Sequence, residues 1–318
     1  MLIVQKFGGS SLAGPERLRR AAAVISGARR QGHAVVAVVS AMGSSTDELL
    51  ALAHAIAPAP PPRELDALLG TGEQQSAALL AITLDSIGEA AVSLSGAQAG
   101  IFAEGAHGDG RIALLFPRRL LETLGQEKVA VVCGFQGVDE AGDLITLGRG
   151  GSDTSAVAIA AALRADRCEI YTDVDGIYTA DPRLLPEARF LPAVDYEDML
   201  RLAQSGAQVL HDRSVRLAMA QGVEIRVLSP RGGVGTLVKH LEEPERPLFA
   251  GLTRDASRGA LTLVGRGAEA GSLSKLVLAL AEEGVPVLGG ALEDGLLRVL
   301  LPPERLEEAM QLCHRLFL

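Results

Sequence analysis

Hydrophobic positions follow two alternating patterns over roughly the first 230 residues. Short β-branched runs without polar alternation, such as "LIVQK" at 2–6 and "AVVAVVS" at 34–40, are separated by longer segments of helical periodicity. Strands of this kind are typical of a parallel sheet that helices cover on both faces. Further strands are expected at 129–133, 168–172 and 224–228, and helices at 14–32, 45–57, 72–87, 152–164, 195–204 and 207–221. The pattern predicts an α/β fold with a mostly parallel sheet.

A different order of elements follows a break in this pattern, where charges and two prolines gather between about 237 and 248. Such a stretch is typical of a linker. Beyond it, the expected order is β-α-β-β-α, with strands at 260–265, 285–290 and 296–302 and helices at 271–283 and 303–317. This order is similar to a ferredoxin-like α+β half-unit. We therefore expect two domains, residues 1–240 and residues 241–318.

Composition narrows the class of protein. The chain has 318 residues, of which 48% are hydrophobic, and 30 Lys and Arg against 39 Asp and Glu give a net charge of −9. With no basic run and only 3% aromatic residues, nucleic acid is excluded as an expected partner. No segment reaches the roughly 18 apolar residues of a membrane span, and the first residues lack the layout of a signal peptide. Three cysteines without metal-ligand spacing complete the expectation of a cytoplasmic protein without a protein-held metal site.

The first strand is followed by "KFGGSS", which combines a cation, two glycines and two hydroxyls. Gly8 and Gly9 allow the backbone to approach a ligand closely, and the following helix start favours negative charge. Lys6 adds a full positive charge, and Ser10 adds a hydroxyl. The segment is therefore interpreted as an anion cradle suited to phosphate. An ordinary strand-helix turn with a surface lysine remains the alternative.

Three further polar residues occupy positions where a ligand would meet the sheet. Ser40 ends the second strand, at the edge where open α/β sheets bind ligands, and Thr46 follows nearby. Both also have a simpler interpretation as helix caps. Glu73 is expected in the first turn of the helix at 72–87, where a carboxylate either complements the helix dipole or receives the ammonium group of a small substrate.

The segment "LGRGGSDTSAVAIAAAL" at 147–163 places an arginine in a glycine-rich turn before a helix of small residues. Arg149 offers a planar fork suited to a carboxylate. Gly151 helps to shape the turn, and Ser152 and Asp153 lie on the first helical turn. A Ser/Asp cap accounts for the last two residues but not for an arginine between glycines. We therefore favour a ligand-binding turn.

The segment "EIYTDVDGIYTADPRLLP" at 169–186 is dense with polar groups directly after an expected strand. A long loop in this position usually serves a ligand. Thr172 and Asp173 begin the loop, Tyr178 is suited to line a base or ribose, and Arg183 is suited to meet phosphate. The Asp-Gly and Asp-Pro pairs within it are also ordinary turn formers.

Taken together, six segments resemble the amino acid kinase family, in particular its aspartate kinases. They occur in the family's order over about 215 residues: "KFGGSS", "VVSAMG", "TGEQ", "GFQGVDEAGDLITLGRGGSDTSA", "YTDVDGIYTADPR" and "SGAQVLHDRSVRLA". The resemblance implies a three-layer αβα catalytic domain at 1–240 and a small ACT-type regulatory domain within 241–318. It also implies transfer of the γ-phosphoryl group of ATP, with Mg²⁺, to the β-carboxylate of L-aspartate.

The resemblance also assigns roles to residues. It implies that Lys6 and Asp153 are catalytic. It implies that aspartate is held by Ser40, Thr46, Glu73, Arg149, Gly151 and Ser152. It implies that ATP is held by Lys6, Gly8, Gly9, Ser10, Thr172, Asp173, Tyr178, Arg183 and Gln208.

Two departures from the family pattern qualify these implications. Gln208 stands where the family usually has a phosphate-contacting lysine, and Asp212 replaces the usual proline. The family usually has two ACT modules after the kinase domain. Only about 70 residues follow the linker here, which is room for one such module, completed by a strand from 249–255. We therefore expect a homodimer or larger homo-oligomer that pairs through this module. The alternatives are a weakened relative that binds ligands and regulates a partner, and a kinase for another amino acid.

Overall fold

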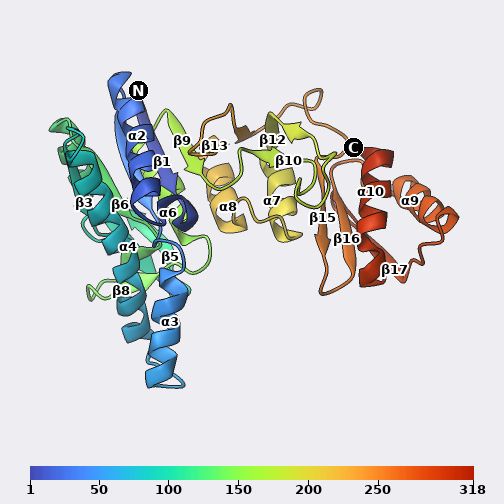
Figure 1. Ribbon diagram of the computed structural model, residues 1–318, viewed down its shortest axis with the longest axis horizontal. Helices are drawn as coiled ribbons and strands as arrows, with labels where there is room; N and C mark the ends of the chain where they lie inside the picture. The colour runs from blue at the N-terminus through green and yellow to red at the C-terminus, as the bar shows by residue number, and fades with distance from the viewer. The chain divides into compact units, whose positions relative to one another are not determined.

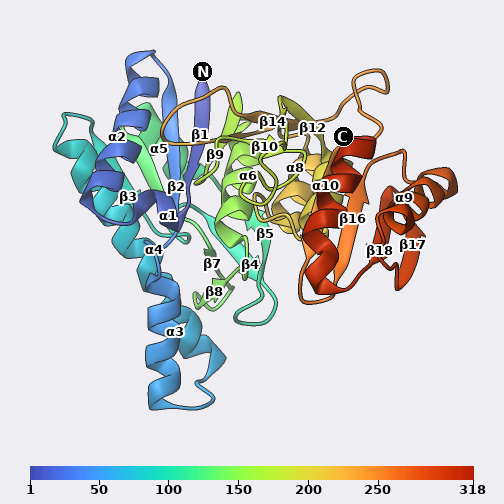
Figure 2. The ribbon, with the colours of Figure 1, turned by 45° about the vertical axis from the view of Figure 1, so that its right-hand side comes forward.

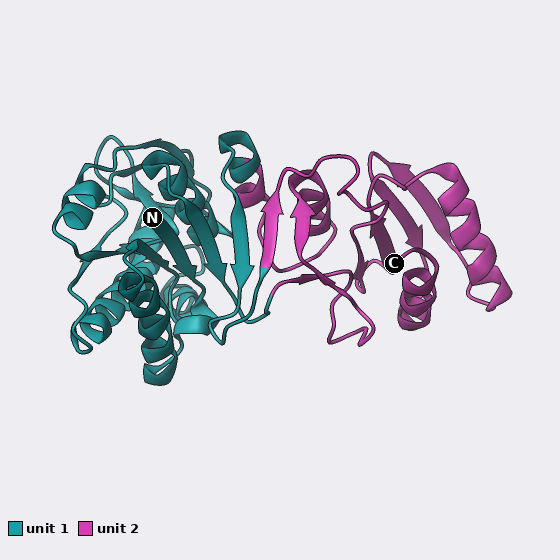
Figure 3. Ribbon diagram, turned by 90° about the horizontal axis from the view of Figure 1, so that it is seen from above, with its two compact units in different colours: residues 1–175, 217–235 teal, residues 176–216, 236–318 magenta.

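The computed structural model describes residues 1–318 and divides into two compact units (Figure 3). Unit 1 comprises residues 1–175 and 217–235, and unit 2 comprises residues 176–216 and 236–318. This division does not coincide with the expected boundary at 240/241, so the two-domain boundary stays a prediction. None of the helices combines the length and the apolar character that a membrane span requires.

Figures 1 and 2 together label the elements of unit 1. They are β1 (Leu2–Phe7), α1 (Gly9–Leu12), α2 (Pro15–Arg30), β2 (Ala34–Val39), α3 (Ser45–Ile56), α4 (Pro62–Asp85), β3 (Ala91–Leu94), β4 (Ile101–Glu104), β5 (Arg111–Leu115), α5 (Arg118–Gly125), β6 (Val129–Cys133), β7 (Gln136–Val138), β8 (Leu144–Thr146), α6 (Gly151–Leu163), β9 (Arg167–Tyr171) and β13 (Ile225–Leu228). The helix α8 (Asp212–Gln221) is shared between the two units.

The main sheet of unit 1 has the strand order β13-β9-β1-β2-β6-β3, and its paired strands are parallel. The expected parallel α/β architecture is confirmed. Figure 2 shows β1 between β2 and β9. Because the chain moves to one side of β1 first and to the other side later, the carboxyl end of β1 is a topological switch point, where open sheets of this kind bind ligands.

Helices cover this sheet on two faces. On one face, α2 and α4 pack over alternate residues of β2 and β6. The core on this face includes Phe7, Ile25, Val35, Val39 and Leu80. On the other face, α6 packs against β1, β2 and β9, and none of its residues joins that core. The expected three layers are therefore present in unit 1.

A second, smaller sheet in unit 1 has the order β5-β4-β7-β8 and was not predicted from the sequence. Its strands are three to five residues long and partly exposed, so they lack the continuous apolar runs of the main sheet. It contacts α4 through β8 and α6 through β5. This sheet matters for the site because β8 leads directly to the turn before α6.

Unit 2 begins with the short pair β10 (Ile177–Tyr178) and β11 (Phe190–Leu191), followed by a parallel pair and a helix. Its elements continue with β12 (Ala193–Asp195), α7 (Tyr196–Gln204), β14 (Thr236–Lys239), β15 (Gly251–Asp255), β16 (Ala260–Val264), α9 (Ala270–Glu282), β17 (Gly289–Glu293), β18 (Leu296–Leu300), the 3₁₀ turn η1 (Pro303–Arg305) and α10 (Leu306–Phe317). The helix expected at 207–221 is shorter, because α8 begins only at Asp212.

The last part of unit 2 has the expected ferredoxin-like character. Its antiparallel sheet has the order β15-β16-β18-β17, and the extra strand expected at 249–255 is present as β15. The strand expected at 285–290 was placed too early. Val285 is buried in the core of this region, and its amide donates to the carbonyl of Leu280, so it closes the end of α9 while β17 begins at Gly289.

Candidate active site

The turn after β1 lies at the switch point and is closely packed. The Gly8 amide donates to the Tyr171 carbonyl at 3.3 Å, and the Gly43 amide donates to the Gly9 carbonyl at 3.0 Å. A Cβ atom added at Gly9 would lie 2.5 Å from the Ala41 carbonyl oxygen, so only glycine fits there. The glycine turn predicted from the sequence is therefore confirmed, and close packing against Ala41 explains why residue 9 is glycine.

A second cation lies at this turn that sequence reasoning missed. The guanidinium of Arg17, near the start of α2, donates to the carbonyl of Ser10. The Ser10 side chain is exposed, as a phosphate-binding hydroxyl would need to be. Nothing in the local sequence distinguishes Arg17 from the other arginines of α2, and only the fold shows that it reaches back to the turn.

Lys6 and Asp153 form an ion pair, with 2.7 Å between the ammonium nitrogen and a carboxylate oxygen. Strand alternation explains this contact, because Phe7 faces the core under α2 and α4 and Lys6 therefore faces α6. Asp153 lies in the first turn of α6. Each side chain is only 12% exposed, so the pair is largely shielded from water. The two residues expected to be catalytic are thus in direct contact.

Glu73 lies in the middle of a helix, and the prediction that it lies in a first turn was wrong. The helix α4 starts at Pro62 and continues through Gly70 and Gly72, ten residues earlier than the expected start at 72. Close packing explains the second glycine, because a Cβ atom at Gly72 would lie 2.8 Å from the Ala41 side chain. A helix-dipole role for Glu73 is therefore removed, since that effect is confined to the first turn.

The Glu73 carboxyl group is buried, with 3% of the residue exposed. One oxygen accepts a hydrogen bond from the Ala41 amide at 2.8 Å, and the other has no hydrogen-bond partner. Burial raises the pKa of Glu73 to about 7, and the hydrogen bond from Ala41 opposes only part of this rise. A buried carboxyl with an unpartnered oxygen is ready to receive a hydrogen-bond donor, preferably a cationic one.

Arg149 is exposed and makes no ion pair within the chain. It lies between Gly148 and Gly150, whose φ angles of 68° and 73° belong to the left-handed region that glycine adopts readily. The next residues, Ser152 and Asp153, are buried in the first turn of α6. The turn therefore presents one free guanidinium next to the start of a helix.

Ser40 and Thr46 are both partly buried. The Ser40 amide donates to the Phe7 carbonyl at 3.1 Å, which places Ser40 beside the carboxyl end of β1. Thr46 is the second residue of α3, and the cap position before that helix is Ser44, whose side chain makes no capping hydrogen bond to the backbone. Gly151 begins α6 at the end of the arginine turn.

The residues expected to bind nucleotide are divided between the two units. In unit 1, the Thr172 hydroxyl donates to the exposed Asp173 carboxylate at 3.1 Å. In unit 2, the Tyr178 ring packs edge-on against Phe190, with 5.6 Å between ring centres. Arg183 forms an ion pair with Asp181 at 2.8 Å, which lowers the pKa of that carboxyl.

Gln208 is exposed in unit 2, in the non-helical segment before α8. The nearby Asp212 contacts His211 at 3.0 Å and Arg216 at 3.7 Å. A neutral amide in place of the family's usual lysine therefore removes one positive charge from this segment.

No cluster of three or more His, Cys, Asp or Glu side chains is arranged to hold a metal ion. Mg²⁺ that arrives with a nucleotide needs few protein ligands, because phosphate oxygens and water supply most of its coordination. The exposed Asp173 carboxylate after β9 is a ligand of the right type. The residues present therefore fit a nucleotide-borne Mg²⁺ rather than an ion in a protein cage.

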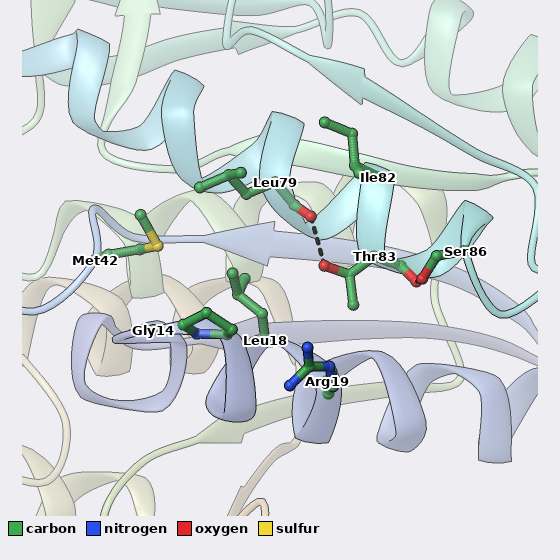
Figure 4. A pocket seen from close by; sticks show the side chains of 9 residues that line it. Gly14, Leu18, Arg19, Met42, Leu79, Ile82, Thr83 and Ser86 are labelled. Atoms are coloured by element: carbon green, nitrogen blue, oxygen red, sulfur yellow. Dashed lines mark hydrogen bonds between the residues drawn. The ribbon is translucent and has the colours of Figure 1, made fainter.

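A groove of about 330 Å³ lies elsewhere in unit 1, between α2 and α4 (Figure 4). Figure 4 shows the hydrogen bond from the Thr83 hydroxyl to the Leu79 carbonyl, at 2.7 Å, on its wall. The groove is lined by Gly14, Pro15, Leu18, Arg19, Met42, Leu79, Ile82, Thr83 and Ser86. None of the residues expected to bind substrate or nucleotide is among them.

Comparison with known proteins gives consistent matches. A model of the amino acid kinase family matches residues 1–229. The aspartokinase of Mycolicibacterium smegmatis is 48% identical over 291 residues, which cover 90% of this chain and 69% of that protein. The aspartokinase of Thermus thermophilus is 47% identical over 287 residues, which cover 90% of this chain and 71% of that protein.

Solved structures give the same result. The aspartate kinase of Synechocystis matches with a TM-score of 0.68 and 39% identity, over 98% of this chain and 54% of that chain. The aspartokinase III of E. coli, solved with aspartate and ADP in its R-state, matches with a TM-score of 0.84 and 22% identity, over 99% of each chain. At that identity, the second match speaks for the fold alone.

Proposed function

We propose that this chain, which belongs to the amino acid kinase family, is an ATP-dependent aspartate kinase. The reaction transfers the γ-phosphoryl group of ATP to the β-carboxylate of L-aspartate and yields 4-phospho-L-aspartate, a step toward lysine, threonine and methionine. The observation that carries the proposal is the shielded Lys6–Asp153 pair at the carboxyl end of β1. The 48% identity to an aspartokinase supports the choice of acceptor.

The proposed chemistry requires no general base, because the acceptor carboxylate is already an anion. Catalysis then consists of in-line positioning and stabilisation of negative charge. Lys6 neutralises charge on the transferred phosphoryl group, and Asp153 holds the ammonium group at the end of β1. Mg²⁺, when bound with ATP, would supply further neutralisation of the phosphates.

The aspartate site is proposed to form in unit 1. Arg149 binds the α-carboxylate with its free guanidinium, and Glu73 receives the ammonium group with its unpartnered oxygen. An ammonium partner favours the ionised form of Glu73, so binding would lower the raised pKa of this carboxyl. The surrounding positions are proposed to be Ser40, Thr46, Gly151 and Ser152.

The nucleotide site is proposed to use the turn after β1 for phosphate. Gly8 and Gly9 form this turn, and Ser10 presents an exposed hydroxyl. Arg17 adds a cation there. The remaining proposed contacts to ATP and its Mg²⁺ are Thr172, Asp173, Tyr178, Arg183 and Gln208.

A coupled assay for ADP release tests the function directly. Aspartate, glutamate and UMP are offered as acceptors under identical conditions with ATP and Mg²⁺. We expect ADP release that depends on aspartate and is much slower with the other two. An absence of aspartate-dependent release at high enzyme concentration would contradict the proposal, and preference for another amino acid would reassign the acceptor.

The exposed Gln208 supports a second candidate, a weakened relative that binds nucleotide or amino acid and regulates a partner. Removal of one cation from a phosphoryl-transfer site costs about 2.7–4 kcal/mol of transition-state stabilisation by analogy with other single electrostatic deletions. Calorimetry that finds aspartate and ATP binding without turnover would favour this candidate.

A homodimer or larger homo-oligomer through the ACT-like region is also proposed. Its edge strand β17 is almost wholly exposed, and Leu292 on this strand, Leu288 just before it and Leu278 on α9 are exposed as well. Such a surface suits pairing with a second copy. A cytoplasmic location is proposed too, supported by three free, buried cysteines.

A further inference from the structure

Asp66, which the sequence analysis did not single out, is a buried carboxylate with an unusually full set of donors. The residue is 1% exposed and lies in α4. One oxygen accepts from the Thr146 hydroxyl at 2.6 Å. The other accepts from the Thr146 amide at 2.9 Å and the Gly108 amide at 3.0 Å, and it lies 3.1 Å from the His107 ring nitrogen Nδ1. Both oxygens are occupied by the protein itself, so Asp66 connects segments rather than binding a ligand.

The segment that Asp66 holds leads into the arginine turn. Thr146 ends β8, and the amide of the next residue, Leu147, donates to the Phe135 carbonyl at 2.8 Å. The helix α6 begins at Gly151. Arg149 therefore lies in a turn of three residues between two fixed ends. Only Leu147 separates Thr146 from this turn, so the position of Thr146 constrains where the turn begins.

The same helix that carries Asp66 also carries Glu73, seven residues later on the same face. Between them, the Gly70 carbonyl accepts from the Gln136 side chain at 3.0 Å. A Cβ atom at Gly70 would lie 2.6 Å from a methyl group of Leu144, so α4 and β8 are in direct contact there. One helix therefore fixes both the buried carboxyl and the strand that leads to Arg149.

We propose that Asp66 is a positioning residue for recognition of the α-amino acid. Through Thr146, it sets the Arg149 turn relative to Glu73, so that the partners of the α-carboxylate and the ammonium group are held ready before substrate binds. Asp66 touches neither reactant. This inference rests on the proposed function, because it assumes that Arg149 and Glu73 hold aspartate.

The substitution Asp66→Asn tests the inference in the full chain. The asparagine amide can keep one oxygen toward the backbone amides of Thr146 and Gly108 and turn its nitrogen toward the Thr146 hydroxyl, but it carries no charge, so every hydrogen bond at this position is weakened. We expect KM for aspartate to rise about tenfold or more, because this is the scale of the loss when hydrogen bonds to a charged group are weakened. KM for ATP should stay within about twofold of the wild-type value. The matched control is Asp143→Asn, which removes a more exposed ion pair with Arg63 between the same helix and the hairpin of β8, and it should leave both constants nearly unchanged because exposed ion pairs contribute little.

Hydrogen exchange gives a readout that does not depend on activity. In Asp66→Asn, backbone amides of residues 144–150 should exchange faster, while those of α9 in unit 2 should not change. If Asp66→Asn does not fold, Thr146→Val provides the test, because it removes the hydroxyl donor and keeps the backbone one. It should raise KM for aspartate by a smaller factor.

These experiments distinguish a failure of the positioning role of Asp66 from a failure of the proposed kinase function. Unchanged KM for aspartate in the folded variant, or an equal rise in KM for ATP, would overturn the positioning role while the kinase assignment stands. If the wild-type chain turns over no aspartate, the proposed function fails, and unchanged exchange at residues 144–150 would then overturn the structural part of the inference as well.

Discussion

Substitution of Glu73 by glutamine should reveal the cost of keeping an ionisable group in this buried position. Burial raises the pKa of Glu73 from 4.5 to about 7. A shift of that size corresponds to about 3 kcal/mol, at roughly 1.36 kcal/mol for each pKa unit. Glutamine keeps the oxygen that accepts from Ala41 but cannot ionise. The wild type and Glu73→Gln therefore differ in how their free energy of unfolding depends on pH, and this difference reports the ionisation of Glu73 alone.

The direction in which the free energy of unfolding changes with pH follows from proton binding. Between about pH 4.5 and pH 7, folded Glu73 retains a proton that the unfolded chain has released, so the free energy of unfolding falls as pH rises. The loss is complete above about pH 7, and the stability is fully present below the ordinary pKa of the group. Relative to Glu73→Gln, the wild-type chain should lose about 3 kcal/mol of stability between about pH 4.5 and about pH 8.

Urea unfolding of both proteins across this pH range measures the difference. A second readout is KM for aspartate, which should fall about tenfold from about pH 6 to about pH 8 in the wild type, as the ionised form becomes dominant. The same constant should be higher and nearly independent of pH in Glu73→Gln. Parallel stability curves for the two proteins would refute the reasoning, because they would mean that Glu73 ionises normally in the folded chain.

Four further substitutions have defined outcomes. Lys6→Met should lower kcat by about 10²–10³, the scale of one electrostatic deletion, with a smaller change in KM for aspartate, as steady-state kinetics would measure. Gly9→Ala should destabilise the fold and impair activity, because its Cβ atom would lie 2.5 Å from the Ala41 carbonyl oxygen. Gly27→Ala in α2 is the control, because its Cβ atom meets no atom within 4 Å, and it should raise the free energy of unfolding by about 0.4–1 kcal/mol. Gln208→Lys should increase the rate of ADP release, and an unchanged rate would show that this position does not contact the phosphates.

Several features of this protein are determined locally and could be predicted from the sequence. The fully apolar runs of β2 and β6 indicate a covered parallel sheet, because such a sheet buries both faces of each strand. The glycine turn around Arg149 is equally local, since the left-handed φ angles at Gly148 and Gly150 favour that residue type.

Other features depend on contacts between distant segments, and only the tertiary structure decided them. Gly70 and Gly72 suggest a helix break by propensity, yet α4 continues through them, and close neighbours that leave no room for a side chain explain why both residues are glycine. The Lys6–Asp153 pair joins two segments that lie far apart in the sequence, and so do the hydrogen bonds between Asp66 and Thr146. Burial and hydrogen-bond partners are properties of packing between segments, so a pattern of spacing along one segment carries no signal for them.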